Sequence, residues 1–274
     1  MLTPPNSSAN HFGKGKIFLV GAGPGAADLI TVRGAKLLEK ADIVFHDALV
    51  EPELLALCPQ ALKVAVGKRC GKLSSAQQFI NKRLVDAAQK YAVVVRLKGG
   101  DPMLFGRADE ELKAIRAAGL EVEIVPGITA ALAGAASLQQ SLTLRGVARS
   151  VAFITLAQAN DHGSSTQPIQ SPSADTLVYY MGRKDAMKIA QQLIDHSPNQ
   201  HTDTPAHILE AVSTSRERNW SSTLGALANG DASDWFDEAS PALIMIGAAL
   251  ASVNQDIELE QLDLGHAGVQ AVSA

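Results

Sequence analysis

The stretch KIFLVGAGPGAAD, residues 16–28, sets the fold of this chain. Its apolar first half stops abruptly at glycines, which is typical of a buried strand in a parallel sheet. After the glycines, Thr31 is a favourable N-cap and predicts a helix that runs to about Ala41. Strand, glycine turn and helix in this order predict the first unit of an α/β domain.

The same alternation continues through the first half of the chain. Glycines or charged residues lie at or just after the end of each predicted strand. Gly119 is placed to stop one of the helices. Five strands and their helices predict a doubly wound α/β domain over residues 15–145, with a parallel sheet covered on both faces. Ligands of such sheets bind beyond the carboxyl ends of the strands. The further strands are expected at 42–47, 62–67, 93–97 and 121–125, and the helices at 51–58, 77–90 (capped by Ser74 or Ser75), 109–118 and 128–137.

A second block, residues 146–253, contains more strand and predicts a second α/β domain with a mixed sheet. A polar, turn-rich segment at 158–174 is expected to be a long exposed loop. We expect residues 1–14 to be a disordered leader and residues 254–274 a weakly ordered tail. The predicted strands lie at 150–157, 176–181, 204–212 and 240–250, and the helices at 184–196 and 223–230.

Composition excludes several classes of protein. The chain has 274 residues, 24 Lys and Arg against 28 Asp and Glu, and a net charge of −4, which argues against a general binder of nucleic acid or of anionic membranes. Two cysteines, Cys58 and Cys70, cannot form a disulfide framework or a cysteine zinc site, and we expect no metal. No apolar run reaches the roughly 18 residues of a membrane span. A cytoplasmic protein is therefore expected.

The first glycine loop has an alternative interpretation. Residues 21–26 match G-x-G-x-x-A, and Asp47 follows at the distance of a ribose-binding acid, so NAD binding is one hypothesis. Two features oppose it. Pro24 lacks the N–H that would bind a pyrophosphate, and the helix cap at Thr31 comes late.

Two further glycine loops, at residues 96–102 and 125–130, favour another ligand. Together with the first loop they belong to a series of seven motifs over residues 16–250. They are VGAGPG, VFHD, VGKR, VRLKGGDPMLFGR, VPGITA, YYMG and SPALIMIG. In this order they resemble the tetrapyrrole methylase family, and within it the branch that acts on uroporphyrinogen III. The resemblance implies two α/β domains that hold S-adenosylmethionine between them, release S-adenosylhomocysteine, and assemble as a homodimer. It also implies two methyl transfers to pyrrole carbons, which give precorrin-2 for sirohaem, cobalamin or haem d1.

The resemblance also implies site residues. Asp47 would accept a proton and Lys68 would donate one, while Arg107 and Glu110 form a second candidate catalytic pair. Structural alternatives stay open: Asp47 as a cap of the helix at 51–58, Asp101 as a turn cap, and Met181 as core filler. The cofactor contacts carried over are Pro24, Gly99, Gly100, Asp101, Leu104, Thr129, Ala130, Met181, Val212 and Ala242.

A tetrapyrrole substrate rich in carboxylates requires a local basic cluster in this acidic chain. Arg107, Arg145 and Arg149 are the main candidates, and Lys68, Arg69, Lys72, Arg96 and Lys98 are further ones. Two positions depart from the family pattern. Ala48 replaces an arginine and Leu144 replaces a histidine. A methylase of another corrinoid intermediate, or a homologue that binds without catalysis, therefore remains an alternative.

Overall fold

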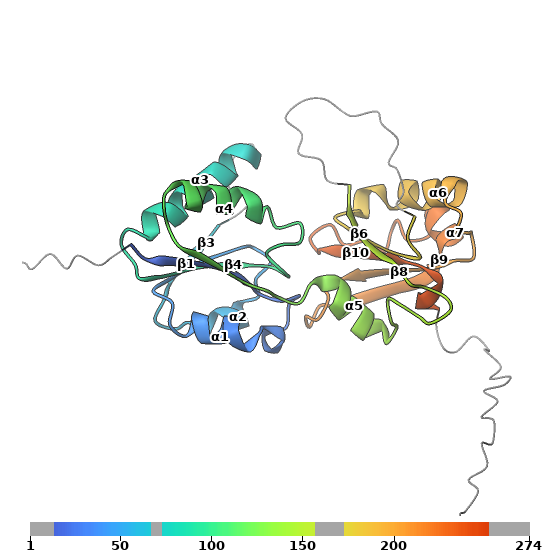
Figure 1. The fold of residues 1–274 in the computed structure, drawn as a ribbon. Coiled ribbons are helices and arrows are strands. Elements are labelled where there is room, and N and C mark those ends of the chain that lie inside the picture. The colour runs from blue at the N-terminus through green and yellow to red at the C-terminus, as the bar shows by residue number, and fades with distance from the viewer. Residues whose placement is uncertain (1–13, 67–72, 157–172, 252–274) are drawn as a thin grey trace, which may run out of the picture.

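The computed structural model describes residues 14–66, 73–156 and 173–251, and Figure 1 shows two α/β domains side by side. The expected leader, tail and long loop fall almost entirely outside these residues. Among the helices described, none combines the length and the apolar character that crossing a membrane requires.

The first domain contains the predicted parallel sheet. Its strand order is β3-β2-β4-β1-β5, and every neighbouring pair is parallel. All carboxyl ends therefore lie at one edge. The strands are β1 (Lys16–Gly21), β2 (Ile43–His46), β3 (Leu62–Ala65), β4 (Val93–Lys98) and β5 (Val122–Val125). The helices are α1 (Val32–Leu38), α2 (Pro52–Leu55), α3 (Leu73–Ala87) and α4 (Ala108–Ala117).

Helices cover both faces of this sheet, as expected for a doubly wound fold. In Figure 1, α3 and α4 lie on one face and α1 and α2 on the other. Successive residues of a strand point to opposite faces. Accordingly, Ile17 and Leu19 of β1 pack in the cluster that holds α3 and α4, whereas Phe18 and Val20 pack in the cluster that holds α1 and α2.

The second domain has a mixed sheet of order β6-β7-β10-β8-β9, in which β6 and β7 are parallel and the other pairs antiparallel. Its strand β9 was not expected. The strands are β6 (Val151–Thr155), β7 (Thr176–Tyr180), β8 (Pro205–Glu210), β9 (Arg218–Thr223) and β10 (Ala242–Ile246). The helices are α6 (Ala186–His196) and α7 (Leu224–Ala228) on one face, and α5 (Ala130–Leu138) on the other.

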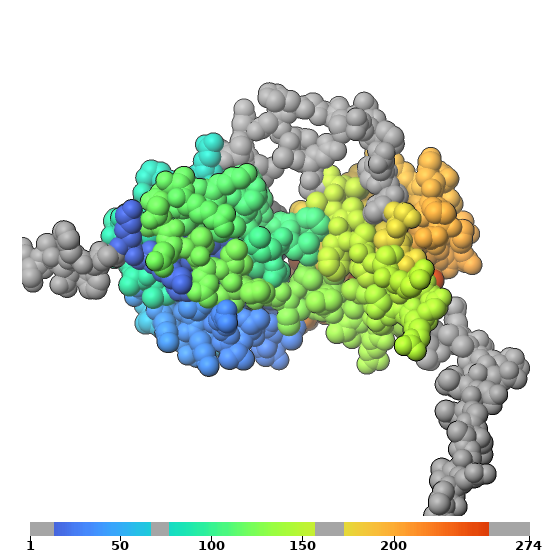
Figure 2. Space-filling view, in the orientation of Figure 1, coloured from blue at the N-terminus to red at the C-terminus, as the bar shows by residue number. Residues whose placement is uncertain are grey.

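Helix α5 belongs by packing to the second domain. Ala131 and Ala133 are buried in a cluster with Val178, Leu209 and Met245 of the second sheet. The packing therefore favours a boundary just after β5, earlier than the one expected after residue 145. Figure 2 shows the green segment around α5 between the two lobes.

Local signals explain several helix ends. Thr31 caps α1 and accepts a hydrogen bond from the Gly34 N–H at 3.1 Å. Gly119 follows Ala118, the C-cap of α4, and has a φ of +65°, as the C′ position requires. The expected cap of α3 is wrong, because this helix begins at Leu73 and both Ser74 and Ser75 lie inside it.

Candidate active site between the two domains

The site begins where the three glycine loops of the first domain meet. The Ala22 N–H donates to the Lys98 carbonyl at 2.7 Å. Gly23 and Gly100 exchange two backbone hydrogen bonds, of 3.2 and 2.7 Å. The loops after β1 and β4 are thereby held together as a short two-stranded bridge.

Glycine at these positions serves two purposes. A Cβ on Gly127 would lie 2.3 Å from the Gly100 oxygen, and one on Gly21 would lie 2.5 Å from the Gly127 Cα, so these two glycines allow the loops to pack. Gly100 is different. It has a φ of +66°, and the nearest atom to its added Cβ is the Thr129 Cα at 3.9 Å. The Gly100 backbone therefore borders open space beside Thr129.

Asp101 fixes the second loop. One carboxylate oxygen accepts the Met103 N–H at 2.7 Å, and the other accepts the Gly127 N–H at 2.8 Å. Each oxygen thus has a backbone donor, so the structure bears out the turn-capping interpretation. Any contact of Asp101 with a ligand is additional to this role.

The second domain closes the site through Tyr180, at the end of β7. The Tyr180 hydroxyl lies 2.6 Å from the Thr129 Oγ1 and accepts the Ala131 N–H at 3.1 Å. Its ring centroid is 5.1 Å from that of Phe105 in the first domain. Burial raises the pKa of Tyr180, and its hydrogen bonds to Thr129 and Ala131 offset this only in part. The hydroxyl therefore stays protonated at neutral pH.

A second contact joins the first glycine loop to the segment after β8. The Ala26 N–H donates to the Ser213 Oγ at 3.1 Å, and a Cβ on Gly25 would lie 2.8 Å from the Val212 oxygen. Ala242 begins the strand β10, which pairs with the end of β8. The loops that carry Pro24, Val212 and Ala242 therefore reach the same seam between the domains.

These contacts use the backbone N–H groups that would have to bind the pyrophosphate of NAD. The N–H groups of Ala22, Gly23 and Ala26 are bonded within the protein, and Pro24 has none. Helix α1 starts only at Val32. The loop therefore offers few of the donors that a pyrophosphate requires.

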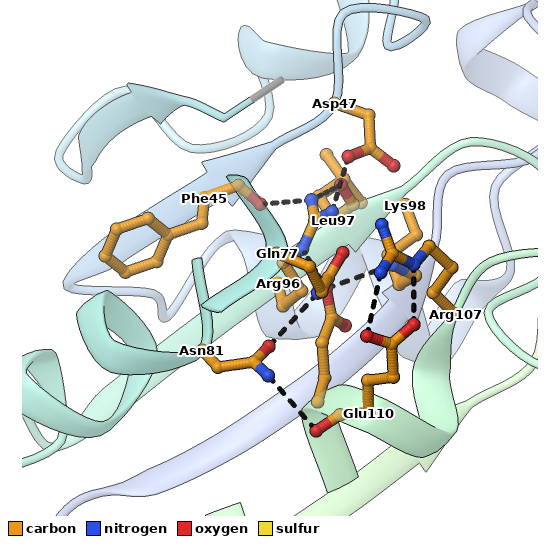
Figure 3. A network of polar contacts seen from close by, with 10 residues as sticks. Phe45, Asp47, Gln77, Asn81, Arg96, Leu97, Lys98, Arg107 and Glu110 are labelled. Carbon is orange, nitrogen blue, oxygen red and sulfur yellow. Dashed lines mark hydrogen bonds and ion pairs between the residues drawn. The ribbon is translucent and has the colours of Figure 1, made fainter. Parts of the chain in front are cut away.

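A buried network of charges lies behind the edge of the first sheet (Figure 3). Arg96 and Lys98 of β4 are 2% and 3% exposed and contact Glu111 at 3.0 and 3.2 Å. Neither side chain is available to a substrate carboxylate. Their expected place in the basic cluster is therefore wrong.

The pKa values of the two cations diverge. Burial lowers the pKa of Arg96, but the carboxylates of Asp47 and Glu111 raise it more, so the guanidinium stays charged. Burial lowers the pKa of Lys98, and the neighbouring charge of Arg96 lowers it further.

Asp47 links this network to the surface. Its Oδ1 lies 2.5 Å from the Arg96 Nη2, and the Asp47 side chain is 30% exposed. The N-cap residue of α2 is Glu51, so Asp47 is not the helix cap considered as an alternative.

Arg107 and Glu110 lie at the start of α4, near the same end of the sheet. Their side chains pair at 2.6 Å and are 41% and 40% exposed, so both are accessible from outside. Arg107 has a φ of 54°, in the left-handed region, where a bulky residue is strained. Lys68, Arg69 and Lys72 lie outside the described residues.

Arg145 and Arg149 are not brought to the site. The Arg149 N–H donates to Asp175, which precedes β7, whereas Tyr180 lies at the opposite end of that strand. Arg145 is exposed in the turn between α5 and β6, just before Arg149. In a single copy of the chain, both lie at the wrong end of the second sheet.

Met181 follows Tyr180 and is 57% exposed, so it is not core filler. Leu104 lies in the Asp101 loop, and its N–H donates to the Asp101 carbonyl at 3.3 Å. Sequence reasoning missed Tyr180, Ser213 and Glu111. One signal for Glu111 was available, because helical spacing places it with Leu112 and Ile115 on the buried face of α4.

Comparison with known proteins decides the family. A model of the tetrapyrrole (corrin/porphyrin) methylases matches residues 16–228. The chain belongs to the tetrapyrrole methylase family. The chain is 40% identical over 250 residues to the uroporphyrinogen-III C-methyltransferase of Pseudomonas aeruginosa, covering 91% of this chain and 98% of that protein.

Other relatives are longer. The chain is 41% identical to the siroheme synthase of Pseudomonas fluorescens over 88% of this chain and 51% of that protein. The chain thus spans about half the length of the siroheme synthases it matches. A solved structure of Thermus thermophilus uroporphyrin-III C-methyl transferase, complexed with S-adenyl homocysteine, superposes with a TM-score of 0.71. It is 34% identical, with 86% of this chain and 99% of that one covered.

Within the part of the chain that the structure describes, no three His, Cys, Asp or Glu side chains are grouped to hold a metal ion.

Proposed function

We propose that this methylase transfers two methyl groups from S-adenosylmethionine to uroporphyrinogen III, forming precorrin-2. The observation that supports this most is that the loops after β1, β4, β7 and β8 meet at one seam between the domains. The likeness to the Pseudomonas aeruginosa enzyme extends over nearly its whole length. S-adenosylmethionine, when bound, supplies a methyl group on a positively charged sulfur.

The residues at the seam fit such a ligand. Gly100 leaves room for close approach of a ligand to the backbone, and the exposed Met181 side chain provides an apolar wall. Thr129 and Ala130 lie at the start of α5, where the Tyr180 hydroxyl already fixes the backbone. We assign Pro24, Gly99, Asp101, Leu104, Val212 and Ala242 to the same site as its remaining walls.

Positioning is the main contribution of the protein to this reaction. A pyrrole carbon must be aligned with the methyl group at close range, and binding in a fixed site supplies much of that advantage. A proton must also leave the ring system. Asp47 is the proposed acceptor, because it is an accessible carboxylate held beside Arg96.

Arg107 and Glu110 are proposed to face the substrate. Arg107 can form two parallel hydrogen bonds with a carboxylate, and its present partner is the exposed Glu110. A substrate carboxylate can replace that partner without uncovering a buried charge. The proposed proton donor, Lys68, rests on the family resemblance alone.

An anaerobic incubation with S-adenosylmethionine and freshly reduced uroporphyrinogen III tests the function. Mass spectrometry of the product should show a gain of two methyl groups, and Asp47→Asn should slow that gain. No gain, with S-adenosylhomocysteine still bound, would reject uroporphyrinogen III. The alternatives would then be another corrinoid substrate, which Ala48 and Leu144 would suit, or a homologue without catalysis.

We further propose that the methylase is a homodimer. A hollow of about 560 Å³ between α5 and β6 is lined in part by Leu132 and Phe153, which are 53% and 38% exposed. The nearby turn carries the exposed Leu144 and Val147. Contact of this face with a second copy would bury these side chains. Light scattering should give twice the mass of the chain, and substituting Leu132 by Glu should reduce it to the monomer.

The proposed location is the cytoplasm, where the buried free thiol of Cys58 stays reduced. Cell fractionation tests this, and recovery of the protein in a membrane or secreted fraction would reject it.

A further inference from the structure

Glu111 is a buried carboxylate that the proposed reaction does not use. It is fully buried, on the inner face of α4. Its Oε1 accepts hydrogen bonds from Arg96 at 3.0 Å, from Lys98 at 3.2 Å and from Gln77 at 3.2 Å. A single oxygen thus gathers three donors, while no partner is found for Oε2 among the described residues.

Arg96 connects this carboxylate to Asp47. The Arg96 Nε donates to Glu111, Nη1 donates to the Leu97 carbonyl at 3.1 Å, and Nη2 donates to Asp47 at 2.5 Å. Every nitrogen of the guanidinium therefore has an acceptor. Because the guanidinium is planar and rigid, fixing Nε fixes the direction in which Nη2 points.

The network pairs two basic side chains with two carboxylates. Arg96 and Lys98 are cations, and Asp47 and Glu111 are the two carboxylates that contact them. Three of these side chains are at most 4% exposed, whereas that of Asp47 is 30% exposed. Asp47 is therefore the exposed end of this otherwise buried network, which Figure 3 shows.

We propose that Glu111 is a positioning residue for Asp47 and acts through Arg96. This inference rests on the proposed function, in which Asp47 accepts a proton. When Glu111 loses its charge, Lys98 no longer contacts a carboxylate, and the guanidinium of Arg96 loses the contact that fixes its plane. Asp47 must then neutralise two buried cations and turns inward, away from the substrate.

The test compares Glu111→Gln, Glu111→Asp and a matched control, Glu210→Gln. Glu210 is also fully buried and contacts an arginine, Arg218, at 2.6 Å, but in the second domain. Each variant is measured for kcat and KM with uroporphyrinogen III, for the Kd of S-adenosylhomocysteine, and for the melting temperature.

Glu111→Gln should lower kcat by about 10- to 100-fold, because a small misplacement of a reacting group has that effect. The KM and the Kd should stay within about threefold of the wild-type values, as for sites that are not coupled. Glu111→Asp, which keeps the charge, should recover part of the loss. Glu210→Gln should lower the melting temperature but leave kcat unchanged.

A double-mutant cycle separates positioning from general damage. In an Asp47→Asn background, Glu111→Gln should cause little further loss of kcat, because its effect passes through Asp47. If Glu111→Gln does not fold, Lys98→Met/Glu111→Gln, which removes one cation together with the anion, replaces it.

Multiplicative losses in that cycle, or a kcat loss equal to that of Glu210→Gln, would overturn the inference. An inactive wild-type protein would instead reject the proposed function.

Discussion

The packing of the glycine loops predicts a large effect for Gly127→Ala. The added Cβ would lie 2.3 Å from the Gly100 oxygen and 2.8 Å from the Gly21 Cα. Carbon contacts are normally about 3.5 Å or longer, so backbone must move by roughly 1 Å. Since both neighbours are backbone atoms, no flexible side chain can yield.

The magnitude follows from two effects. Overpacking of a tight site destabilises a protein by about 1–3 kcal/mol. Moving Gly100 also weakens the hydrogen bond that its carbonyl accepts from the Gly23 N–H at 3.2 Å, which contributes about 1 kcal/mol. We therefore expect a loss of about 2–4 kcal/mol, or a fall in melting temperature of roughly 4–16 °C.

The assay is thermal unfolding together with titration of S-adenosylhomocysteine. Gly127→Ala should weaken binding of this ligand, because Gly100 and Thr129 move with the loop. Gly146→Ala is the control, since nothing lies within 4 Å of its added Cβ, although its φ of +80° carries some strain. A Gly127→Ala protein with wild-type melting temperature and affinity would refute the reasoning.

Three further substitutions test other contacts. Tyr180→Phe removes the hydroxyl that holds Thr129 and the start of α5, and it should cost about 1–2 kcal/mol and weaken S-adenosylhomocysteine binding; unchanged affinity would separate Thr129 from the cofactor site. Arg218→Ala leaves the fully buried Glu210 without its cation and should lower the free energy of unfolding by about 3 kcal/mol in urea titrations; a loss below about 1 kcal/mol would contradict this. Burial lowers the pKa of His207, so the unfolded chain binds a proton more readily, and stability should fall as the pH drops below about 6.5. Melting curves from pH 7.5 to 5.5 should show a shallower slope for His207→Gln than for the wild type.

The strands of the first domain could be predicted because their signals are local. Each is an apolar run that ends at glycine or at a charged residue, and β1 through β5 appear where expected. Strand β9 could not be predicted in this way. Its sequence RNWSST is polar and mostly exposed at the edge of the second sheet, so it carries no apolar alternation.

The placement of α5 depends on long-range packing. The sequence AALAGAASL is apolar and small on every side, so it does not indicate which sheet it covers. Only the contacts of Ala131 and Ala133 with the second sheet decide this.

The site was predictable where motifs lie at strand ends, and less so where partners are distant in sequence. Arg96 and Lys98 stand in the strand VVVRLK, next to residues expected to bind a ligand, and were assigned to the substrate. The buried carboxylate that pairs with them, Glu111, lies in the following helix, α4. Similarly, the sequence predicts the strand that follows Arg149, but it does not show that Arg149 lies at the end of the second sheet opposite the site.

The most direct test of the account is a crystal structure of the protein grown with S-adenosylhomocysteine. The account predicts the ligand at the seam between the domains, in contact with the Gly99–Gly100 loop, the start of α5 at Thr129 and Met181. A ligand bound to one domain alone, at the first glycine loop and α1 as a dinucleotide would be, would contradict it.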